Sequence, residues 1–459
     1  MIKTLLETDY LIIGCGAAGM AFADTLVSHS DAQIIMVDRR HAPGGHWVEA
    51  YPFVRLHQPS AFYGVNSMPL GDDAIDQCGL NAGMYERATG AEIVGYYQRV
   101  MDQRLLPSGR VQYFPMCDYV GDGQFVARTS GKTFQVKVGK KLVDAHYLQP
   151  SVPASYPAPF NVADGARCVP VNELATLSEP ADRYVIIGGG KTGIDACLWL
   201  LENQVPPDAI CWVRPRDSWL ANRKAFQPGA PAFESFSMVV EIAANAENPQ
   251  DFVRQLTDCE QFFPMENGVE PTMFKYATVN KQELTLLRSI TNVVRGARVE
   301  RIDREQIVLD HGSIPTSIQS LHVHCAAPGL RLRPNLPIFT EDKITLQAIR
   351  PGSTPFAAAL TAYVEASRDD VAEKNTLCPP NAYMDVPTDL IRNTLIGLKA
   401  DYQWTRHRDI MDWLQASRLN LVRGVAQQLD QPQVRQSMQR FTANAPKAVA
   451  NLQQLLAQL

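Results

Sequence analysis

The sequence lacks the features of a nucleic-acid-binding, membrane-spanning or disulfide-stabilised protein. Its 43 lysines and arginines are outnumbered by 48 aspartates and glutamates, for a formal net charge of −5, whereas binding nucleic acid requires a basic surface. No run of about 18 uninterrupted apolar residues is present, so we expect no membrane span. The nine cysteines form no Cys-x-x-Cys pair and no regular framework, which favours free thiols in a reducing cytoplasm.

A secretion signal and a metal-ligand cluster are missing as well. Glu7 and Asp9 precede the first apolar run, and a glycine loop follows that run where a signal peptide would have a cleavage site. His322 and His324 share one face of a predicted strand, but no third ligand lies nearby, so we expect no metal site and a structural role for both. A chain of 459 residues, 46% of them hydrophobic, is long enough for two or three domains.

The main positive signal is a pair of glycine-rich loops, each directly after a short apolar run that reads as a strand. The first loop is Gly14-Cys15-Gly16-Ala17-Ala18-Gly19, and the second is Gly188-Gly189-Gly190-Lys191-Thr192-Gly193. In such loops the first glycine permits a tight turn, the second lets the backbone approach a pyrophosphate, and the third lets helix and strand pack closely. Two of them in one chain predict two bound dinucleotides. We expect the glycines, Ala17, Ala18, Lys191 and Thr192 to contact them.

The residues after the first loop complete a nucleotide-binding unit. A helix is expected over 20–28 and a second strand over 33–37, which ends at Asp38. An acidic residue about 20 positions beyond the glycine loop is placed to accept hydrogen bonds from ribose hydroxyls. We include the neighbouring Arg39 in the predicted cofactor site. Alternatively, Asp38 is an ordinary turn aspartate at the end of a strand.

A long irregular segment follows, dense in aromatic residues, histidine and glutamine. Loops of this kind are more often functional than structural, and we expect this one to wrap a flat ring. Its candidate contacts are Gly45, His46, Trp47, His57 and Gln58. Ordinary packing is the alternative for each aromatic residue taken alone.

The second glycine loop is followed by a predicted helix over 192–203 and a strand over 210–213. This strand ends on Arg214-Pro215-Arg216 where the first unit has an acid. A guanidinium grips a 2′-phosphate bidentately, whereas an acid would repel it. Arg214 and Arg216 therefore favour NADPH over NADH, unless they are surface arginines of a loop.

The remaining segments are assigned from their periodicity. Short alternating segments over 110–147 predict a small antiparallel insertion. Helical patterns at 236–244, 249–260 and 282–288 predict a helical insertion that roofs the site, and apolar spacing after residue 388 predicts a helical tail. The strand at 320–324 runs into small residues ending at Gly329, where the backbone can approach a cofactor.

Together these residues resemble the two-dinucleotide-binding-domain flavoproteins, and among them the flavin-containing monooxygenases and their bacterial relatives. The resemblance rests on the first loop with Asp38, on Gly44-Gly45-His46-Trp47, on Asn66 and on the second loop with Arg214. It covers roughly residues 8–70 and 183–225, and more weakly 321–365. The family's Phe-x-Gly-x-x-x-His signature before the second loop is absent from residues 160–170.

The resemblance implies an α/β fold with two Rossmann-like domains, the second inserted in the first, and a C-terminal helical appendage. We expect an FAD-binding domain over 1–160 and 316–385. An NADPH-binding domain over 161–315 would contain the helical insertion 228–292, and residues 386–459 would form the appendage.

For the activity, the resemblance implies an FAD-dependent, NADPH-using monooxygenase that oxygenates a small organic substrate with molecular oxygen, through a flavin C4a-oxygen adduct stabilised by Asn66. One alternative is an NADPH-dependent flavin oxidoreductase that passes electrons to an organic acceptor without inserting oxygen. Another is a non-catalytic flavin-binding protein. A disulfide reductase is disfavoured because no second cysteine lies near Cys15.

Overall fold

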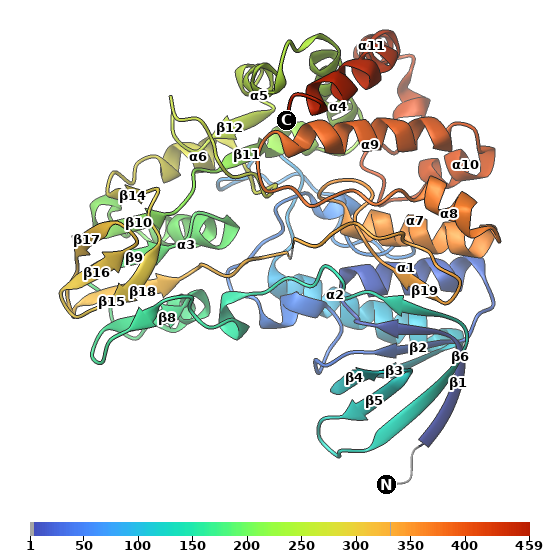
Figure 1. The fold of residues 1–459 in the computed structure, drawn as a ribbon, viewed down its shortest axis with the longest axis horizontal. Helices are drawn as coiled ribbons and strands as arrows, with labels where there is room; N and C mark the ends of the chain where they lie inside the picture. Colours follow the sequence, from blue (N-terminus) through green and yellow to red (C-terminus); the bar gives the residue numbers. More distant parts are fainter. Residues whose placement is uncertain (1–3, 331) are drawn as a thin grey trace.

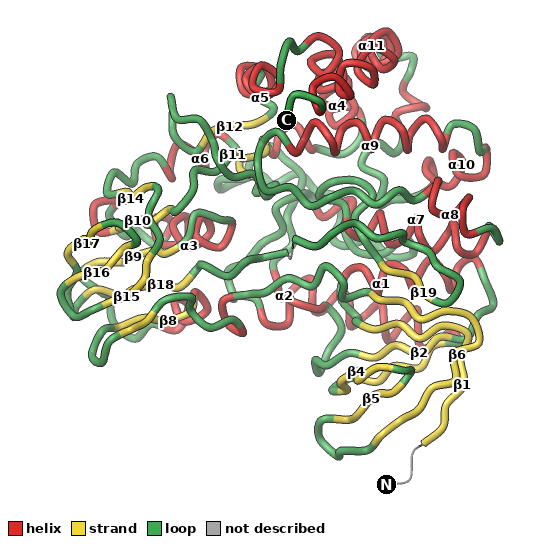
Figure 2. The backbone as a smooth tube through the Cα atoms, viewed as in Figure 1, coloured by secondary structure: helices red, strands yellow, loops and turns green. Residues whose placement is uncertain are grey.

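The computed structural model describes residues 4–330 and 332–459. Two sheets lie apart from each other, the first mixed and the second wholly parallel, and a layer of helices lies above them (Figure 1). Coloured by secondary structure, the two sheet regions and the mainly helical upper layer are easily separated (Figure 2). Long loops run between the three parts, so the space where they meet is bounded by segments from the whole length of the chain.

The first sheet is built on five parallel strands in the order β3-β2-β1-β6-β19, and the antiparallel strands β5 and β4 continue from the first half of β6. The prediction of a separate antiparallel insertion over 110–147 is therefore wrong for β3 and β6, which pair in parallel with β2 and β1. The bounds are β1 Thr4–Ile13, β2 Ile34–Val37, β3 Val111–Phe114, β4 Cys117–Gly121, β5 Gln124–Ala127, β6 Thr133–Asp144 and β19 Lys343–Thr345.

Alternating side chains give this sheet two buried faces. Ile12 and Met36 pack with Phe22 of helix α1 in one core, whereas Leu11 and Ile35 pack with Phe125 of β5 in another. This alternation is what a strand buried on both sides requires. The helical face is covered by α1 (Ala17–His29), α2 (Gly90–Val100), α7 (Thr354–Ser367) and α8 (Val371–Leu377).

The second sheet is wholly parallel, in the order β14-β10-β9-β18-β8. Helices α3 (Lys191–Glu202) and α6 (Lys281–Leu287) cover one face, and a small sheet of β7, β15, β16 and β17 covers the other. The bounds are β7 Asn161–Val162, β8 Arg167–Pro170, β9 Arg183–Ile187, β10 Ile210–Arg214, β14 Val293–Arg295, β15 Val299–Ile302, β16 Gln306–Leu309, β17 Gly312–Pro315 and β18 Ser320–His324. The fold is thus α/β with two Rossmann-like units, the second within the chain of the first.

The upper layer joins two stretches that are far apart in the sequence. Helices α4 (Ala230–Asn245) and α5 (Pro249–Asp258) match the helices expected there, and they share one hydrophobic core with α9 (Asp389–Trp404) and α11 (Pro432–Leu456). Its other elements are β11 Trp219–Asn222, β12 Phe262–Pro264, β13 Thr278–Val279 and α10 Arg408–Ala416. The expected insertion and the expected tail therefore form a single layer, which we call the helical cap (residues 219–279 and 389–456).

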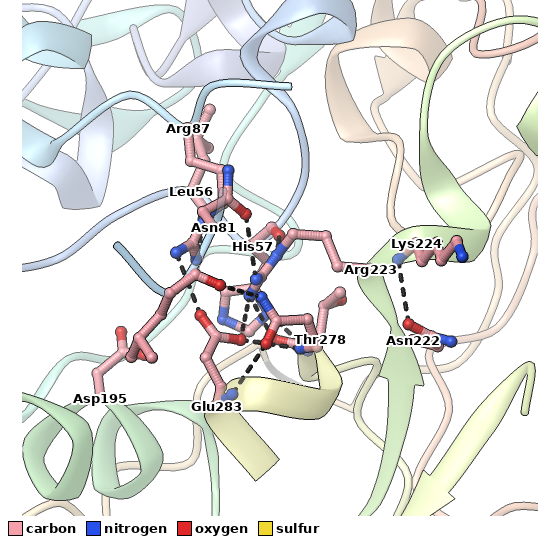
Figure 3. Close-up of polar contacts among 12 residues, drawn as sticks. Leu56, His57, Asn81, Arg87, Asp195, Asn222, Arg223, Lys224, Thr278 and Glu283 are labelled. Carbon is pink, nitrogen blue, oxygen red and sulfur yellow. Dashed lines mark hydrogen bonds and ion pairs between the residues drawn. The ribbon is translucent and has the colours of Figure 1, made fainter. Parts of the chain in front are cut away.

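A buried network of charges joins the two nucleotide units (Figure 3). Glu283 at the start of α6 accepts from Arg223 (Nη2 to Oε2, 2.7 Å) and from Arg87 (Nη2 to Oε1, 3.2 Å). Arg223, only 1% exposed, also donates from Nε to the His57 carbonyl oxygen at 3.0 Å. Arg87 and His57 come from the first unit, whereas Arg223 and Glu283 come from the second part of the chain. The network therefore sets how the two units meet.

We expect Glu283→Gln to lower stability by about 3–5 kcal/mol at pH 7, since it leaves two buried guanidinium groups without a counter-charge. Burial alone would raise the pKa of Glu283, but Arg223 and Arg87 outweigh burial and hold that pKa below its usual value. A carboxyl group with a lowered folded pKa stabilises above its unfolded pKa of about 4.3, and this contribution is lost as the pH falls through the folded value.

The gap between wild type and Glu283→Gln should accordingly shrink below about pH 4, as measured by urea unfolding across pH. Glu260→Gln is the matched control, because Glu260 pairs with Lys281 at 2.6 Å in a largely exposed salt bridge that contributes little to stability. Equal losses for the two variants would contradict the assigned role of Glu283.

Candidate functional site

One cavity of about 1400 Å³ lies where the two nucleotide units and the helical cap meet. Both glycine loops line it, together with the irregular segment after Asp38 and the ends of strands in both sheets. Pockets for a single small ligand have volumes of about 300–1000 Å³. The cavity therefore has room for more than one bound molecule.

The first glycine loop presents an open helix end to this cavity. Gly14 has a φ of +104°, which favours glycine, and a Cβ atom on Gly19 would overlap the Gly14 carbonyl oxygen. Helix α1 begins after Gly16 with no side-chain cap and no acid in its first turn, so its free N–H groups suit an anion. Gly14, Gly16, Ala17 and Ala18 line the cavity, whereas Gly19 serves the packing of helix on strand.

Asp38 lies beside this loop, as predicted, and is also part of its structure. One carboxylate oxygen accepts the Cys15 backbone N–H at 2.6 Å, and the other accepts that of Arg40 at 2.8 Å. The carboxylate still lines the cavity, and so does Arg39 next to it. Each carboxylate oxygen has a second lone pair for a ribose hydroxyl.

The irregular segment places all five of its candidate contacts, Gly45, His46, Trp47, His57 and Gln58, on the cavity wall. Trp47 is oriented by its indole N–H, which donates to the Tyr63 hydroxyl at 2.8 Å. The His46 ring lies against that of Trp47, and burial lowers the pKa of His46 to about 4. His46 is therefore neutral at physiological pH.

His57 offers a donor to the cavity. Its Nδ1 accepts the Thr278 backbone N–H at 3.1 Å. Burial, followed by the positive charges of Lys191 and Arg223, lowers the pKa of His57 well below its ordinary value. The single proton of the neutral ring is then on Nε2, which is buried and has no hydrogen-bond partner in residues 4–330 and 332–459. The chain thus leaves an unsatisfied N–H donor on a residue that lines the cavity.

The second glycine loop repeats the geometry of the first. Gly188 has a φ of +136°, and a Cβ on Gly193 would overlap the Gly188 carbonyl oxygen. Helix α3 begins after Gly190 without a side-chain cap or an acid in its first turn, and a Cβ at Gly190 would meet open space. Gly188, Gly190, Lys191 and Thr192 line the cavity; Gly193 does not, and like Gly19 it serves close packing.

Two residues that the sequence did not reveal hold Lys191 at the cavity. Lys191 forms an ion pair with Asp195 one turn along α3, and the Tyr51 hydroxyl donates to the same carboxylate at 2.6 Å. Burial lowers the pKa of Lys191, against the opposing effect of Asp195. Tyr51 comes from the first unit, so this contact also joins the two units. Only the spacing of four between Lys191 and Asp195 could have signalled the pair.

The predicted role of Arg214 needs correction. Its side chain is 1% exposed, donates to Glu266 at 2.6 Å, lies over the Trp212 ring and does not line the cavity. Its Nε and Nη1 are buried without a partner among the described residues, so the guanidinium is not placed at the cavity where a phosphate would bind. Arg216 does line the cavity, with one nitrogen 2.9 Å from each carboxylate oxygen of Asp385.

Asn66, predicted to lie by the flavin, is also misplaced. Its Oδ1 accepts the Ser417 hydroxyl at 2.8 Å, and its side chain is not part of the cavity wall. The neighbouring Arg418 donates to the carbonyl oxygens of Tyr63 (2.6 Å) and Ala61 (2.9 Å). These contacts hold residues 61–66 against the cap.

Several other features bear on the site. Gly329 lines the cavity, and its carbonyl oxygen accepts the Ser151 N–H at 2.9 Å. His322 and His324 both contact backbone carbonyl oxygens, of Arg167 and Tyr156 respectively, which fits a structural role. Within residues 4–330 and 332–459, no helix is long and apolar enough to cross a bilayer.

Comparison with solved structures identifies the fold. Cyclohexanone-bound cyclohexanone monooxygenase in its rotated conformation superposes with a TM-score of 0.52 and 12% sequence identity, covering 89% of this chain and 98% of that one. Weaker matches include a flavin-containing monooxygenase from Stenotrophomonas maltophilia (TM-score 0.40, 14% identity, 89% and 99% covered). Bacillithiol disulfide reductase from Bacillus cereus matches with a TM-score of 0.45 and 12% identity, over 79% and 100%.

No family model matches the sequence. Its relatives include the proteins named "Uncharacterized protein Rv2000" and "Uncharacterized protein MT2056" from two strains of Mycobacterium tuberculosis, and "Uncharacterized protein Mb2023" from Mycobacterium bovis. Each is 46% identical over 438 residues, which cover 94% of this chain and 81% of the relative. The chain therefore belongs to the family of these mycobacterial proteins, and it has the two-dinucleotide-binding fold seen in cyclohexanone monooxygenase.

Proposed function

We propose that the protein is an NADPH-dependent FAD oxidoreductase, and specifically a monooxygenase acting on a small organic substrate. The observation that carries the proposal is that one cavity is lined by both glycine loops, each of which leads into an uncapped helix N-terminus. FAD would bind at the first loop and NADPH at the second, so that both cofactors share one enclosed space. Cyclohexanone monooxygenase, whose fold this chain shares, supports the finer assignment.

The residues at the first loop fit FAD. The free N–H groups at the start of α1 would bind its pyrophosphate, Asp38 would accept from the ribose, and Trp47, His46 and Gly45 would lie along the flat ring. Bound FAD supplies two-electron chemistry, since it takes hydride from NADPH and, once reduced, can react with oxygen. The protein orients the two cofactors and excludes water.

At the flavin, Gln58 takes the place that we first gave to Asn66. Gln58 lines the cavity, and its side chain makes no hydrogen bond to any residue that the structure describes. Its amide is therefore free to donate to oxygen or to the flavin edge. The neutral His57 supplies a second donor from Nε2. Two such donors stabilise negative charge without becoming charged themselves.

The alternative without oxygen insertion uses the same cofactor sites. An NADPH-dependent flavin oxidoreductase would pass electrons to an organic acceptor, and only the fate of the reduced flavin separates it from a monooxygenase. A thiol-based reductase has less support, because burial raises the pKa of both cysteines that line the cavity, Cys325 and Cys117. A thiol with a raised pKa is a poor nucleophile.

To test the function, the purified yellow protein is reduced with NADPH under nitrogen and then mixed with air in a stopped-flow spectrophotometer. Monooxygenase function predicts bleaching by NADPH and a return of the oxidised spectrum in two resolved steps. A return in one step, with one hydrogen peroxide formed per NADPH, would support the acceptor oxidoreductase. A yellow protein that neither NADPH nor NADH bleaches would contradict the proposal.

Gly16→Val and Gly190→Val form a reciprocal pair for the two cofactor assignments. Both positions are extended (φ −79° and −86°), so valine adds bulk without backbone strain. We expect Gly16→Val to purify colourless. Gly190→Val should keep its FAD but lose at least about tenfold in the rate of bleaching by NADPH, the loss that about 1.4 kcal/mol of lost interaction would give. Normal FAD content in Gly16→Val would overturn the assignment of FAD to the first loop. Unchanged bleaching in Gly190→Val would overturn the assignment of NADPH to the second loop.

Arg216→Met tests the preference for NADPH. If Arg216 leaves Asp385 to bind the 2′-phosphate, its loss should raise the Kd for NADPH by about tenfold or more and leave that for NADH nearly unchanged, because charged hydrogen bonds contribute about 1.5–3 kcal/mol. Arg214→Met is the control, and we expect it to lower the melting temperature and weaken both coenzymes alike. An Arg216→Met protein that loses equal affinity for the two coenzymes would contradict the role of Arg216.

A further inference from the structure

One face of helix α9 forms part of the cavity wall. The residues of α9 that line the cavity recur every three or four positions, as residues on one face of a helix do. Ile391, Leu395 and Leu398, on other sides of the helix, pack into the core of the cap instead. The stripe consists of Leu390, Asn393, Thr394, Gly397, Asp401, Trp404 and Thr405.

Gly397 leaves room at the centre of this stripe. A glycine inside a helix costs about 1 kcal/mol relative to alanine, and it is commonly explained by close packing. Close packing does not explain Gly397, because a Cβ atom there would have no neighbour within 4 Å among the described residues. A side chain at this position would project into the cavity. The glycine therefore keeps open a space that a bound molecule can use.

Asn393, one turn before Gly397, leaves a hydrogen-bond acceptor unused. The residue is 2% exposed, and its Nδ2 donates to the Asp389 carbonyl oxygen at 3.0 Å. That bond fixes the orientation of the amide, since the flipped amide would set Oδ1 against a carbonyl oxygen. Oδ1 is buried and has no partner within residues 4–330 and 332–459. A buried acceptor without a donor costs about 1–3 kcal/mol, so a ligand that brings an O–H or N–H group is favoured here.

The wall contributed by α4, α11 and residues 419–422 is largely apolar. Its large side chains include Phe233, Phe236 and Phe441, with ring centroids 5.6–6.0 Å apart for the two pairs that Phe441 makes. No charged side chain of these three segments lines the cavity in the described part of the chain. On α9 the single acid of the stripe, Asp401, is paired with Arg350. A charged substrate would lose its hydration here without gaining a counter-charge.

We propose that this part of the cavity, which we call the α9 pocket (the α9 stripe with Phe233, Phe236 and Phe441), binds the substrate. The substrate is an uncharged, mainly apolar molecule with one O–H or N–H donor that Asn393 accepts. Gly397 sets the room for its apolar body, and Asn393 selects the donor. The inference rests on the proposed function, because it takes the flavin and nicotinamide to occupy the ends of the cavity at the two glycine loops.

The test uses the FAD-loaded protein and three probes that differ only at the head group: decanol, decyl methyl ether and decanoate. Isothermal titration calorimetry should give a Kd for decanol about fivefold lower than for the ether, the ratio expected from a hydrogen bond of about 1 kcal/mol. Decanoate should bind at least about tenfold more weakly than decanol. Equal affinities for decanol and the ether, no binding of either, or a preference for decanoate would overturn the proposal.

Two pairs of variants assign the effects to residues. Asn393→Leu should abolish the preference for decanol over the ether. Asn444→Leu should keep it, because Asn444 makes the same bond to the carbonyl four residues earlier (2.9 Å to Arg440) but lies outside the cavity wall. Gly397→Leu should weaken both neutral probes about tenfold or more. Gly95→Leu, also within a helix and outside the cavity wall, should leave both unchanged.

Gly397→Ala is the control for a folding defect in Gly397→Leu. Alanine should raise the melting temperature, since it favours a helix by about 1 kcal/mol over glycine, while it weakens the neutral probes by a smaller factor than leucine does. Probe binding that neither Gly397 variant changes would refute the α9 pocket.

FAD content and bleaching by NADPH are recorded on the same samples. A yellow, NADPH-reducible protein without the predicted probe preferences refutes this inference alone, whereas a colourless wild-type protein refutes the proposed function.

Discussion

The carboxylate of Glu283, held between Arg223 and Arg87, is the contact on which the geometry of the cavity depends. The core of the second unit also includes Tyr51 and Val54 of the first unit, so apolar packing holds the two units together. Apolar packing is non-directional, however, and does not by itself set the angle at which the units meet. The network does, because its hydrogen bonds run from defined nitrogens to defined oxygens. Removing the Glu283 carboxylate leaves two buried guanidinium groups without a counter-charge. Bridging charges thus constrain relative orientation more sharply than two apolar faces would.

The same network also orients the His57 ring, whose Nε2–H group is the donor. Arg223 binds the His57 carbonyl oxygen while its Nη2 also contacts the Thr278 carbonyl oxygen at 3.2 Å, and the Thr278 N–H occupies Nδ1 of the histidine. Orientation, tautomer and neutral state of the ring therefore depend on groups of the second unit and the cap, of which Thr278 and Lys191 also line the cavity. Burial and, after it, the positive charges nearby lower the pKa of His57, so the charges that join the units also help to determine which hydrogen bond His57 can offer.

Sequence signals were reliable where structure is decided locally. The glycine loops, their helices and the strand that ends at Asp38 depend on residues within one βαβ unit, and all are found where expected. The predictions for Arg214 and Asn66 were wrong because distant partners set the directions of these side chains. Arg214 binds Glu266, 52 residues away, and Asn66 binds Ser417, 351 residues away. The parallel pairing of β3 and β6 was missed for a related reason: short alternating segments look alike whether they join a hairpin or a sheet edge. Tyr51 and Asp195 carried no motif, since their contact exists only once the two units meet.

The cavity wall divides its chemistry between the parts of the fold. Its charged side chains come mainly from the nucleotide units and the loops beside them, whereas the cap contributes mostly apolar groups and uncharged amides. This division follows from what each part must bind: phosphates and ribose require helix termini and charges, and these are supplied by the glycine loops. The cap is built from two stretches far apart in the sequence, residues 219–279 and 389–456, which share one core. Substitutions on its inner face can therefore change what the cavity accepts without disturbing the loops that hold the cofactors. The glycine loops and the inner face of the cap are thus physically separate parts of the cavity wall.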